Sequence, residues 1–244
     1  MRLYKIIQAK FFFIFILYLM LASKCAAEGR CVILLHGLGR THYSMSKLST
    51  YLKLHHYIVI NQSYSTTRKS IEELAEQSIA PMINACLKYQ PDDINFVTHS
   101  LGGIVLQQYL QHHKVPKLSR IVMLAPPNHG SPIADLLHNN FLFKIIIGPS
   151  GQELQTNNHS VPNQLPQHFP HQVGIIAGNF SFNPFGKLFF THEANDGEVA
   201  VSSTRMNDMQ DFIVLPVSHT FIMSNTRVME QILYFLDNGK FTRK

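Results

Sequence analysis

The chain has 244 residues, of which 45% are hydrophobic and 15% are charged. This length and composition fit one globular domain with a sizeable core, and they exclude a low-complexity or repeat protein. The formal net charge is +6 at pH 7, but residues 1–27 hold four of the cations and no acids, so the remainder carries only +2. The basic balance therefore gives no reason to expect a nucleic-acid partner.

The first 27 residues predict a secretory signal peptide. Three cations precede an apolar run over residues 11–22, and Ala26 and Ala27 supply the small residues of a cleavage site. We expect cleavage after Ala27, with cleavage after Cys25 as the alternative, and a single domain over residues 28–244, exported to a periplasm or secreted. An uncleaved N-terminal anchor is the alternative, although the apolar run is shorter than the about 20 residues that span a membrane.

Strands and helices are expected to alternate along most of the mature chain. Continuous apolar runs predict strands buried on both faces, and apolar residues at helical spacing predict the helices between them. This alternation favours an α/β fold with a mostly parallel sheet. Strands are expected at 31–35, 57–60, just before Ser100, 120–125, 173–178 and 211–215, with helices at 44–54, 71–87, 101–113 and 228–236. Ser70 and Glu73 have the spacing of a capping box at the start of the second helix.

The mature chain keeps two cysteines, Cys31 in a predicted strand and Cys86 in a predicted helix. An exported protein can join such a pair in a disulfide. Two buried free thiols are the alternative, because both positions fall in predicted core elements. Neither cysteine has the neighbours of a catalytic thiol.

The strongest motif is Thr98-His99-Ser100-Leu101-Gly102-Gly103, between a predicted strand and a predicted helix. A sharp strand-to-helix turn lifts the serine hydroxyl out of the sheet and aims the first helical N–H groups at a reacting carbon. Thr98 is bulkier than the glycine usual at its position, whereas Gly102 and Gly103 keep the other side clear. For this stretch alone, a turn that merely caps a buried helix is the alternative.

The alternation breaks down over residues 131–170. The apolar stretch 141–147 and the proline-rich loop after it fit either a lid or cap over a site, or an ordinary helix packed on the sheet. A cluster of aromatic residues follows, which fits either an acyl pocket or part of the core. These residues are Phe180, Phe182, Phe185, Phe189 and Phe190.

A serine nucleophile needs a base to remove its proton and an acid to orient that base. In hydrolases with this turn the order along the chain is serine, acid, histidine. His219, just after the last predicted strand, is the candidate base. Asp196, in the turn Asn195-Asp196-Gly197, is the candidate acid, and Glu198 is the alternative.

Two other histidines are assigned supporting roles. His99 adjoins the serine and would point away from it across the turn, so we expect it to pack in the interior. His36 is expected to brace its loop through hydrogen bonds. None of the fourteen histidines has the spacing with cysteine or aspartate that suggests zinc, so we predict no metal.

Four motifs in this order resemble the bacterial lipase/esterase branch of the α/β-hydrolase superfamily, the group similar to the GPI inositol-deacylase serine esterases. They are His36-Gly37-Leu38-Gly39, residues 98–103, Asn195-Asp196-Gly197 and Ser218-His219. The resemblance covers residues 30–236. It implies the α/β-hydrolase fold, a mostly parallel sheet with helices on both faces, with a lid inserted over residues 131–170 as an option.

The same resemblance implies a serine hydrolase without a cofactor that cleaves carboxylic esters, lipid esters above all, through an acyl-enzyme. Ser100 would be the nucleophile, His219 the base and Asp196 its acid. The backbone N–H groups of Leu38 and Leu101 would form the oxyanion hole.

Other functions stay open on the sequence alone. A thioesterase or amidase would use the same triad, and a non-catalytic protein of this fold would bind lipid instead. As partners we expect an ester or lipid substrate and a transient contact with a lipid surface through the Phe-rich stretch. The sequence gives no indication of the oligomeric state.

Overall fold

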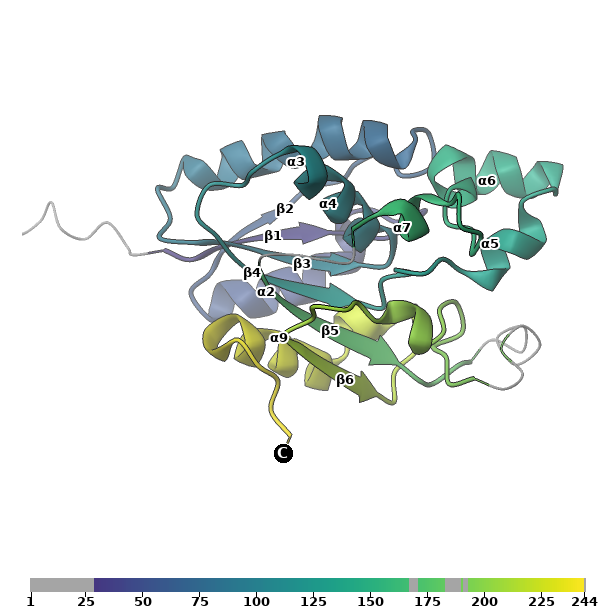
Figure 1. The fold of residues 1–244 in the computed structure, drawn as a ribbon. Coiled ribbons are helices and arrows are strands. Elements are labelled where there is room, and N and C mark those ends of the chain that lie inside the picture. Colours follow the sequence, from purple (N-terminus) through teal and green to yellow (C-terminus); the bar gives the residue numbers. More distant parts are fainter. Residues whose placement is uncertain (1–28, 167–170, 183–189, 191–192, 244) are drawn as a thin grey trace, which may run out of the picture.

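The computed structural model describes residues 29–166, 171–182, 190 and 193–243 (Figure 1). The predicted signal peptide and its cleavage site lie outside the described residues and stay predictions. The described strands form one parallel six-stranded sheet in the order β2-β1-β3-β4-β5-β6. Among the described helices, none is long and apolar enough to cross a membrane.

The predicted strands and helices are confirmed, with ends shifted by a few residues. The strands are β1 (Cys31–Leu35), β2 (Ile58–Asn61), β3 (Ile94–His99), β4 (Leu118–Leu124), β5 (Gln172–Gly178) and β6 (Asp211–Leu215). The helices are α2 (Ser46–Leu54), α3 (Ile71–Leu87), α4 (Leu101–His112), α5 (Pro132–Leu137), α6 (Phe141–Gln152), α7 (Val161–Gln164) and α9 (Thr226–Asn238). Short 3-10 turns lie at η1 (His42–Met45), η2 (Ser202–Thr204) and η3 (Ile222–Ser224).

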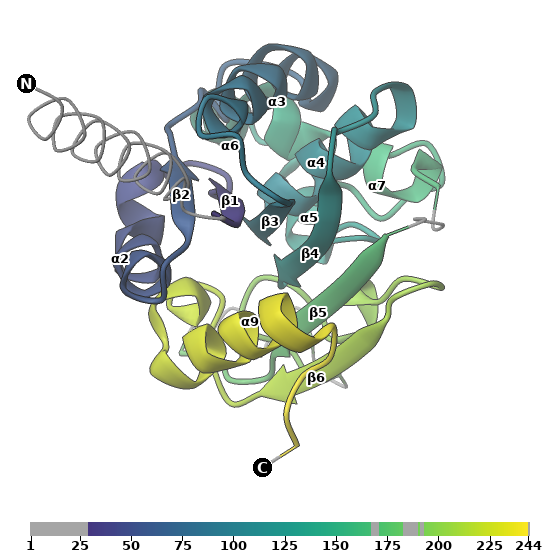
Figure 2. The ribbon, with the colours of Figure 1, turned by 90° about the vertical axis from the view of Figure 1, so that its left-hand side faces the viewer.

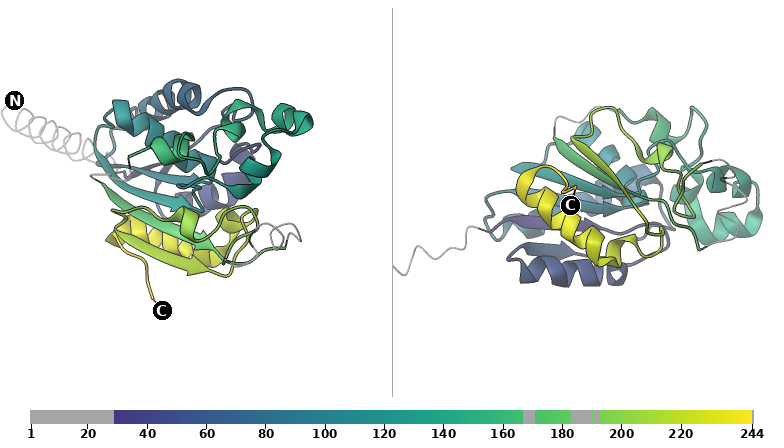
Figure 3. Two further views of the ribbon diagram at one scale, coloured as in Figure 1. Left: turned by 45° about the vertical axis from the view of Figure 1, so that its right-hand side comes forward. Right: turned by 90° about the horizontal axis from the view of Figure 1, so that it is seen from below.

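Helices cover both faces of the sheet. α3 and α4 lie on one face, and α2 and α9 lie side by side on the other (Figures 2 and 3). Because successive side chains of a strand point to opposite faces, β1 feeds both cores: Ile33 packs towards α3 and Val32 towards α2. The expected α/β architecture, a mostly parallel sheet between two helical layers, is confirmed.

Helix α3 is fixed at both ends. At its start, the N–H of Glu73 donates to Ser70 Oγ at 3.1 Å and the N–H of Ser70 donates to Glu73 Oε2 at 2.9 Å. This is the predicted capping box. In its last turn, Cys86 forms a disulfide with Cys31 of β1, with the two Cα atoms 6.0 Å apart. The alternative of two free thiols is therefore wrong.

The region after β4 forms the short helices α5, α6 and α7. Figure 1 shows α5 and α6 beyond the carboxyl ends of the strands. This region is tied to the start of α3, because Glu153 Oε2 accepts a 2.7 Å hydrogen bond from the N–H of Ile71 and the Ser150 hydroxyl donates to Thr66 O. This location fits the lid or cap, one of the two alternatives for residues 131–170, and that role stays a prediction.

Candidate active site

Ser100 lies on the bend between β3 and α4, at the carboxyl edge of the sheet. Its φ of 51° and ψ of −123° are rare for a residue with a side chain, because Cβ crowds the backbone there. The bend is held by two backbone hydrogen bonds of 2.9 Å, from Ser100 N to Leu124 O and from Gly103 N to Ser100 O. The strand-to-helix turn predicted from the motif is therefore present, and its backbone is strained.

The glycines after Ser100 let α4 approach the sheet closely. A Cβ added at Gly102 would lie 2.7 Å from Leu35 O, and one added at Gly103 would lie 3.2 Å from Thr98 Oγ1. Thr98 is accommodated two positions before the serine because the facing residue of α4 has no side chain. A Cβ at Gly37 would lie 3.2 Å from Ser100 Cβ, so the loop after β1 lies against the serine.

Two backbone N–H groups flank Ser100. Leu101 supplies the first N–H of α4, where the helix dipole is positive, and Leu38 follows Gly37 in the adjoining loop. Within the described part of the chain, neither N–H donates to a backbone or side-chain acceptor. Both groups therefore keep a donor for a ligand.

Asp196 and His219 are directly hydrogen-bonded. His219 Nδ1 donates to Asp196 Oδ2 at 2.7 Å, and both side chains are almost fully buried, 3% and 1% exposed. The backbone N–H of His219 also donates to Asp196 O at 3.0 Å. Asp196 Oδ1 accepts from the N–H groups of Glu198 and Val199 at 3.1 and 2.8 Å. This bonding fixes the ring tautomer and leaves Nε2 as the basic nitrogen.

Glu198, the alternative acid, lies at the other ring nitrogen. Its Oε2 is 3.6 Å from His219 Nε2, and its side chain is 49% exposed. Burial acts to lower the pKa of His219, but the carboxylates of Asp196 and Glu198 outweigh burial and raise that pKa above its ordinary value. The two acids thus act on opposite sides of one imidazole.

His99 joins the serine segment to the histidine segment. His99 Nε2 donates to His219 O at 3.1 Å, and the two rings lie 4.8 Å apart. Burial, with the neighbouring His219 as a further cause, lowers the pKa of His99 well below its ordinary value, so the ring is neutral. The expected interior packing of His99 is confirmed.

The segment of Ser100 adjoins the segment of His219, because His99, the residue before Ser100, contacts His219. Among the described residues, the Ser100 hydroxyl forms no hydrogen bond with His219 Nε2. Catalytic hydrogen bonds of this kind are often long in unliganded proteins and shorten when substrate binds.

His36 braces the loop that carries Leu38, as expected. Its Nδ1 donates to Gly37 O at 3.0 Å, and its Nε2 accepts from the N–H of Tyr64 at 3.2 Å. The Tyr64 ring stacks on the imidazole at 4.2 Å, and its hydroxyl donates to His36 O at 2.5 Å. Sequence reasoning missed Tyr64, because nothing in the local pattern links residues 28 positions apart.

Three other acids between Ser100 and His219 accept hydrogen bonds from residues other than His219. Asp135 accepts from the N–H of Thr156 between α6 and α7, Glu193 accepts from the N–H of Ser202, and Asp211 accepts from the N–H of Phe241 at 2.7 Å. Across the described residues, no group of three or more His, Cys, Asp or Glu side chains could hold a metal ion.

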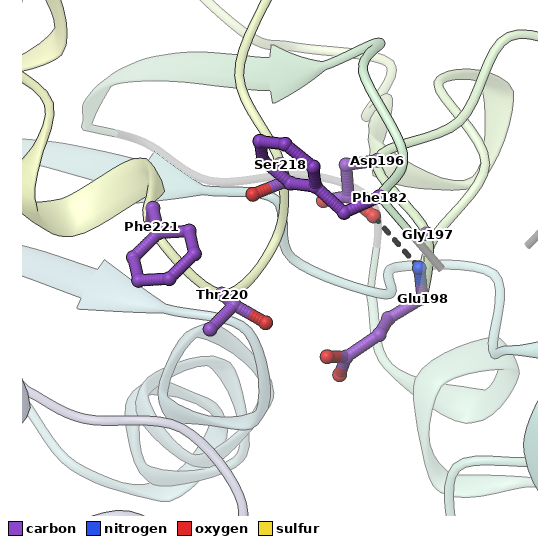
Figure 4. Close-up of a pocket in the computed structure, with 7 residues that line it drawn as sticks. All are labelled: Phe182, Asp196, Gly197, Glu198, Ser218, Thr220 and Phe221. Atoms are coloured by element: carbon purple, nitrogen blue, oxygen red, sulfur yellow. Dashed lines mark hydrogen bonds between the residues drawn. The ribbon is translucent and has the colours of Figure 1, made fainter. Parts of the chain in front are cut away.

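A pocket of about 200 Å³ is lined in part by Ser218 and Thr220, the residues on either side of His219 in the chain (Figure 4). Of the Phe-rich stretch, Phe180 and Phe182 are exposed and meet edge to face at 4.5 Å, whereas Phe190 is buried. Phe185 and Phe189 lie outside the described residues. Sequence reasoning did not find this pocket, which two separate loops form. Its lining residues are Phe182, Asp196, Gly197, Glu198, Ser218, Thr220 and Phe221.

Residues 30–144 match the family model described as alpha/beta hydrolase fold. No curated protein matches the sequence. Among solved structures, mature Bacillus licheniformis lipase BlEst2 is similar with a TM-score of 0.73 at 19% identity, over 87% of this chain and 93% of that chain. Legionella pneumophila phospholipase PlaB, in complex with thio-NAD, has a TM-score of 0.66 at 18% identity, over 86% of this chain and 59% of that chain.

Aspergillus fumigatus lipase B is also similar, with a TM-score of 0.62 at 13% identity, over 86% of this chain and 53% of that chain. At these identities the superpositions establish the fold. Together with the family match over residues 30–144 and the parallel sheet between two helical layers, they show that the chain has the α/β-hydrolase fold.

Proposed function

We propose that the protein is a serine hydrolase that cleaves carboxylic esters, lipid esters above all, through an acyl-enzyme. The observation that carries this proposal is the buried 2.7 Å hydrogen bond between His219 and Asp196, in which His219 also contacts His99, the residue before a serine on a strained bend. A histidine held in this way is the base that a serine nucleophile needs. The lipases and the phospholipase among the structures of similar fold support the reaction class.

In the proposed reaction, Ser100 Oγ attacks the ester carbonyl carbon while His219 Nε2 takes the hydroxyl proton. The bond from that carbon to the alcohol oxygen then breaks, and His219 returns the proton to the leaving alcohol. A water molecule, activated by the same imidazole, cleaves the acyl-serine bond and releases the acid. Asp196 keeps the imidazole oriented throughout and stabilises its charged form.

The backbone N–H groups of Leu38 and Leu101 are proposed as the oxyanion hole. They flank Ser100, and among the described residues both keep their donor unused. Each donor that meets the developing negative charge contributes on the order of 10²-fold or more to turnover.

The apolar surface at the carboxyl edge of the sheet is an argument for a lipid substrate and for a transient contact with a lipid surface. Helices α5 and α6 at this edge expose several large apolar side chains, a feature that marks interaction sites on soluble proteins. These side chains are Leu136, Phe141, Ile145 and Ile146. The basic side chain of Lys144, also exposed on α6, favours anionic lipid headgroups.

We also propose that the protein is exported, to a periplasm or out of the cell. The disulfide between Cys31 and Cys86 supports this location, because such bonds persist in oxidising compartments. N-terminal sequencing of the protein recovered outside the cytoplasm, with Glu28 as the expected first residue, tests the predicted cleavage.

The Ser100→Ala variant tests the proposed reaction. We expect hydrolysis of p-nitrophenyl butyrate to fall by roughly 10⁶-fold and labelling by a fluorophosphonate probe to be lost. The Ser44→Ala variant, changed at a partly exposed serine, should keep both. Equal hydrolysis by the wild type and a folded Ser100→Ala variant would show that the proposal is wrong. Acyl-matched ester, thioester and amide substrates then separate an esterase from a thioesterase or amidase.

A further inference from the structure

We propose that the pocket beside His219 binds a quaternary ammonium group on the alcohol part of the substrate, as in a choline ester. This inference rests on the proposed ester hydrolysis and names its substrate class. The pocket combines two aromatic rings with the half-exposed carboxylate of Glu198, a combination that recognises a trimethylammonium group, and the second acid of its wall, Asp196, is buried against His219.

The two rings are Phe182 and Phe221, which come from different segments of the chain. Phe182 follows β5 and Phe221 follows β6, and their ring centroids are 6.4 Å apart with perpendicular planes. The rings are not buried in the core, since Phe182 is 71% exposed and Phe221 is 58% exposed. They therefore offer aromatic surface to a ligand, and the face of an aromatic ring attracts cations.

Glu198 supplies the negative charge. In Figure 4 its carboxylate and the Thr220 side chain reach towards a common space that Phe182 and Phe221 border. An acyl chain would gain nothing from a carboxylate at this wall, and an anionic headgroup would be repelled by it. A cation with methyl groups is attracted by the carboxylate and packs its methyl groups on the rings.

The pocket lies on the side of the proposed reaction where the alcohol leaves. Glu198 Oε2 is 3.6 Å from His219 Nε2, the nitrogen that would return the proton to the leaving alcohol. A charged group two carbons from the ester oxygen, as in choline, would stay close to this nitrogen. The volume of about 200 Å³ is below the roughly 300–1,000 Å³ of pockets for drug-sized ligands, so it fits one compact group.

The test compares butyrylcholine with 3,3-dimethylbutyl butyrate, which has the same shape without the charge. We expect wild-type kcat/KM to favour the choline ester by roughly 10-fold. In Glu198→Gln and Phe221→Leu this ratio should fall towards one. Glu230→Gln and Tyr89→Leu remove an exposed acid and an exposed aromatic ring elsewhere, and they should keep the ratio.

The possible results separate this inference from the proposed function. If the neutral ester is cleaved but the choline ester has no advantage, the pocket inference is wrong and the proposed ester hydrolysis stands. The inference is also wrong if the ratio is the same in Glu198→Gln and Phe221→Leu as in the wild type. If neither these esters nor p-nitrophenyl butyrate is cleaved, the proposed function fails and the inference fails with it.

Discussion

At the scale of single residues, His219 is placed between two carboxylates that contact opposite ring nitrogens. Asp196 is buried and bonded to Nδ1, whereas Glu198 is half exposed and lies 3.6 Å from Nε2. The buried acid orients the ring through this hydrogen bond. The exposed acid reaches the nitrogen that would exchange protons with serine and substrate, so its main effect is on the charge of the ring.

The Glu198→Gln variant should shift the pH dependence of hydrolysis. A base works only when neutral, so activity rises as the pH passes the pKa of His219. The Glu198 carboxylate helps to raise that pKa, and its removal should move the acidic limb of kcat/KM to lower pH. The measurement is a pH profile with the neutral substrate p-nitrophenyl butyrate, with Glu230→Gln as the control. A limb that stays in place would show that Glu198 does not influence the charge of the base.

At the scale of elements, the first turn of α4 is fitted closely to the end of β1. Gly102 faces Leu35 O without a side chain, and this contact sets the distance between the loop after β1 and Ser100. The oxyanion donors proposed at Leu38 and Leu101 come from these two elements. The distance between these two N–H groups therefore depends on Gly102, although Gly102 takes no part in the reaction.

The Gly102→Ala variant should be less stable and less active. In an unhindered helix, this change stabilises by about 1 kcal/mol. Here the new Cβ would lie 2.7 Å from a backbone oxygen, and overpacking of this kind costs about 1–3 kcal/mol. We expect net destabilisation in urea unfolding and slower ester hydrolysis. A more stable variant with unchanged turnover would show that α4 can move away from β1 at no cost.

Helix α6 offers a second test at this scale. Replacing Ile145 and Ile146 by serine should lower activity on lipid vesicles or emulsions. The reason is that the variant lacks two apolar side chains that would insert into the lipid surface. Activity on a dissolved short-chain ester should stay unchanged. Leu54→Ser, at an exposed position of α2, is the matched control. Equal losses on both kinds of substrate would contradict a role in surface contact.

At the scale of the whole molecule, the disulfide links the first strand of the sheet to the end of α3. It closes a loop with a sequence separation of 55 residues. The chain-entropy treatment of such a loop gives about 4 kcal/mol of stabilisation. This is a large share of the about 5–15 kcal/mol by which a typical domain is stable.

The double variant Cys31→Ala and Cys86→Ala should unfold at a midpoint lower by about 10 °C. Thermal unfolding followed by circular dichroism, for oxidised wild type, reduced wild type and the double variant, gives this measurement. Reduced wild type and the double variant should behave alike. If both unfold at the temperature of the oxidised protein, the disulfide does not stabilise the fold.

Local patterns in the sequence determined the elements and the order of the motifs. Apolar runs of strand length marked the strands, including Asp211–Leu215, and the Ser70 and Glu73 pair marked the start of α3. The motif around Ser100 predicted the bend, because a strand and a helix that follow each other directly leave few backbone conformations for the residue between them. Such features depend on neighbours within a few positions.

Only the tertiary structure decided the contacts between distant segments. It paired Cys31 with Cys86, stacked Tyr64 on His36, and set Asp196 and Glu198 at different nitrogens of one ring. It also brought Phe182 and Phe221 to one pocket. The physical reason is that these contacts follow from strand order and from the paths of loops, whereas hydrophobic periodicity reports only which face of each element is buried.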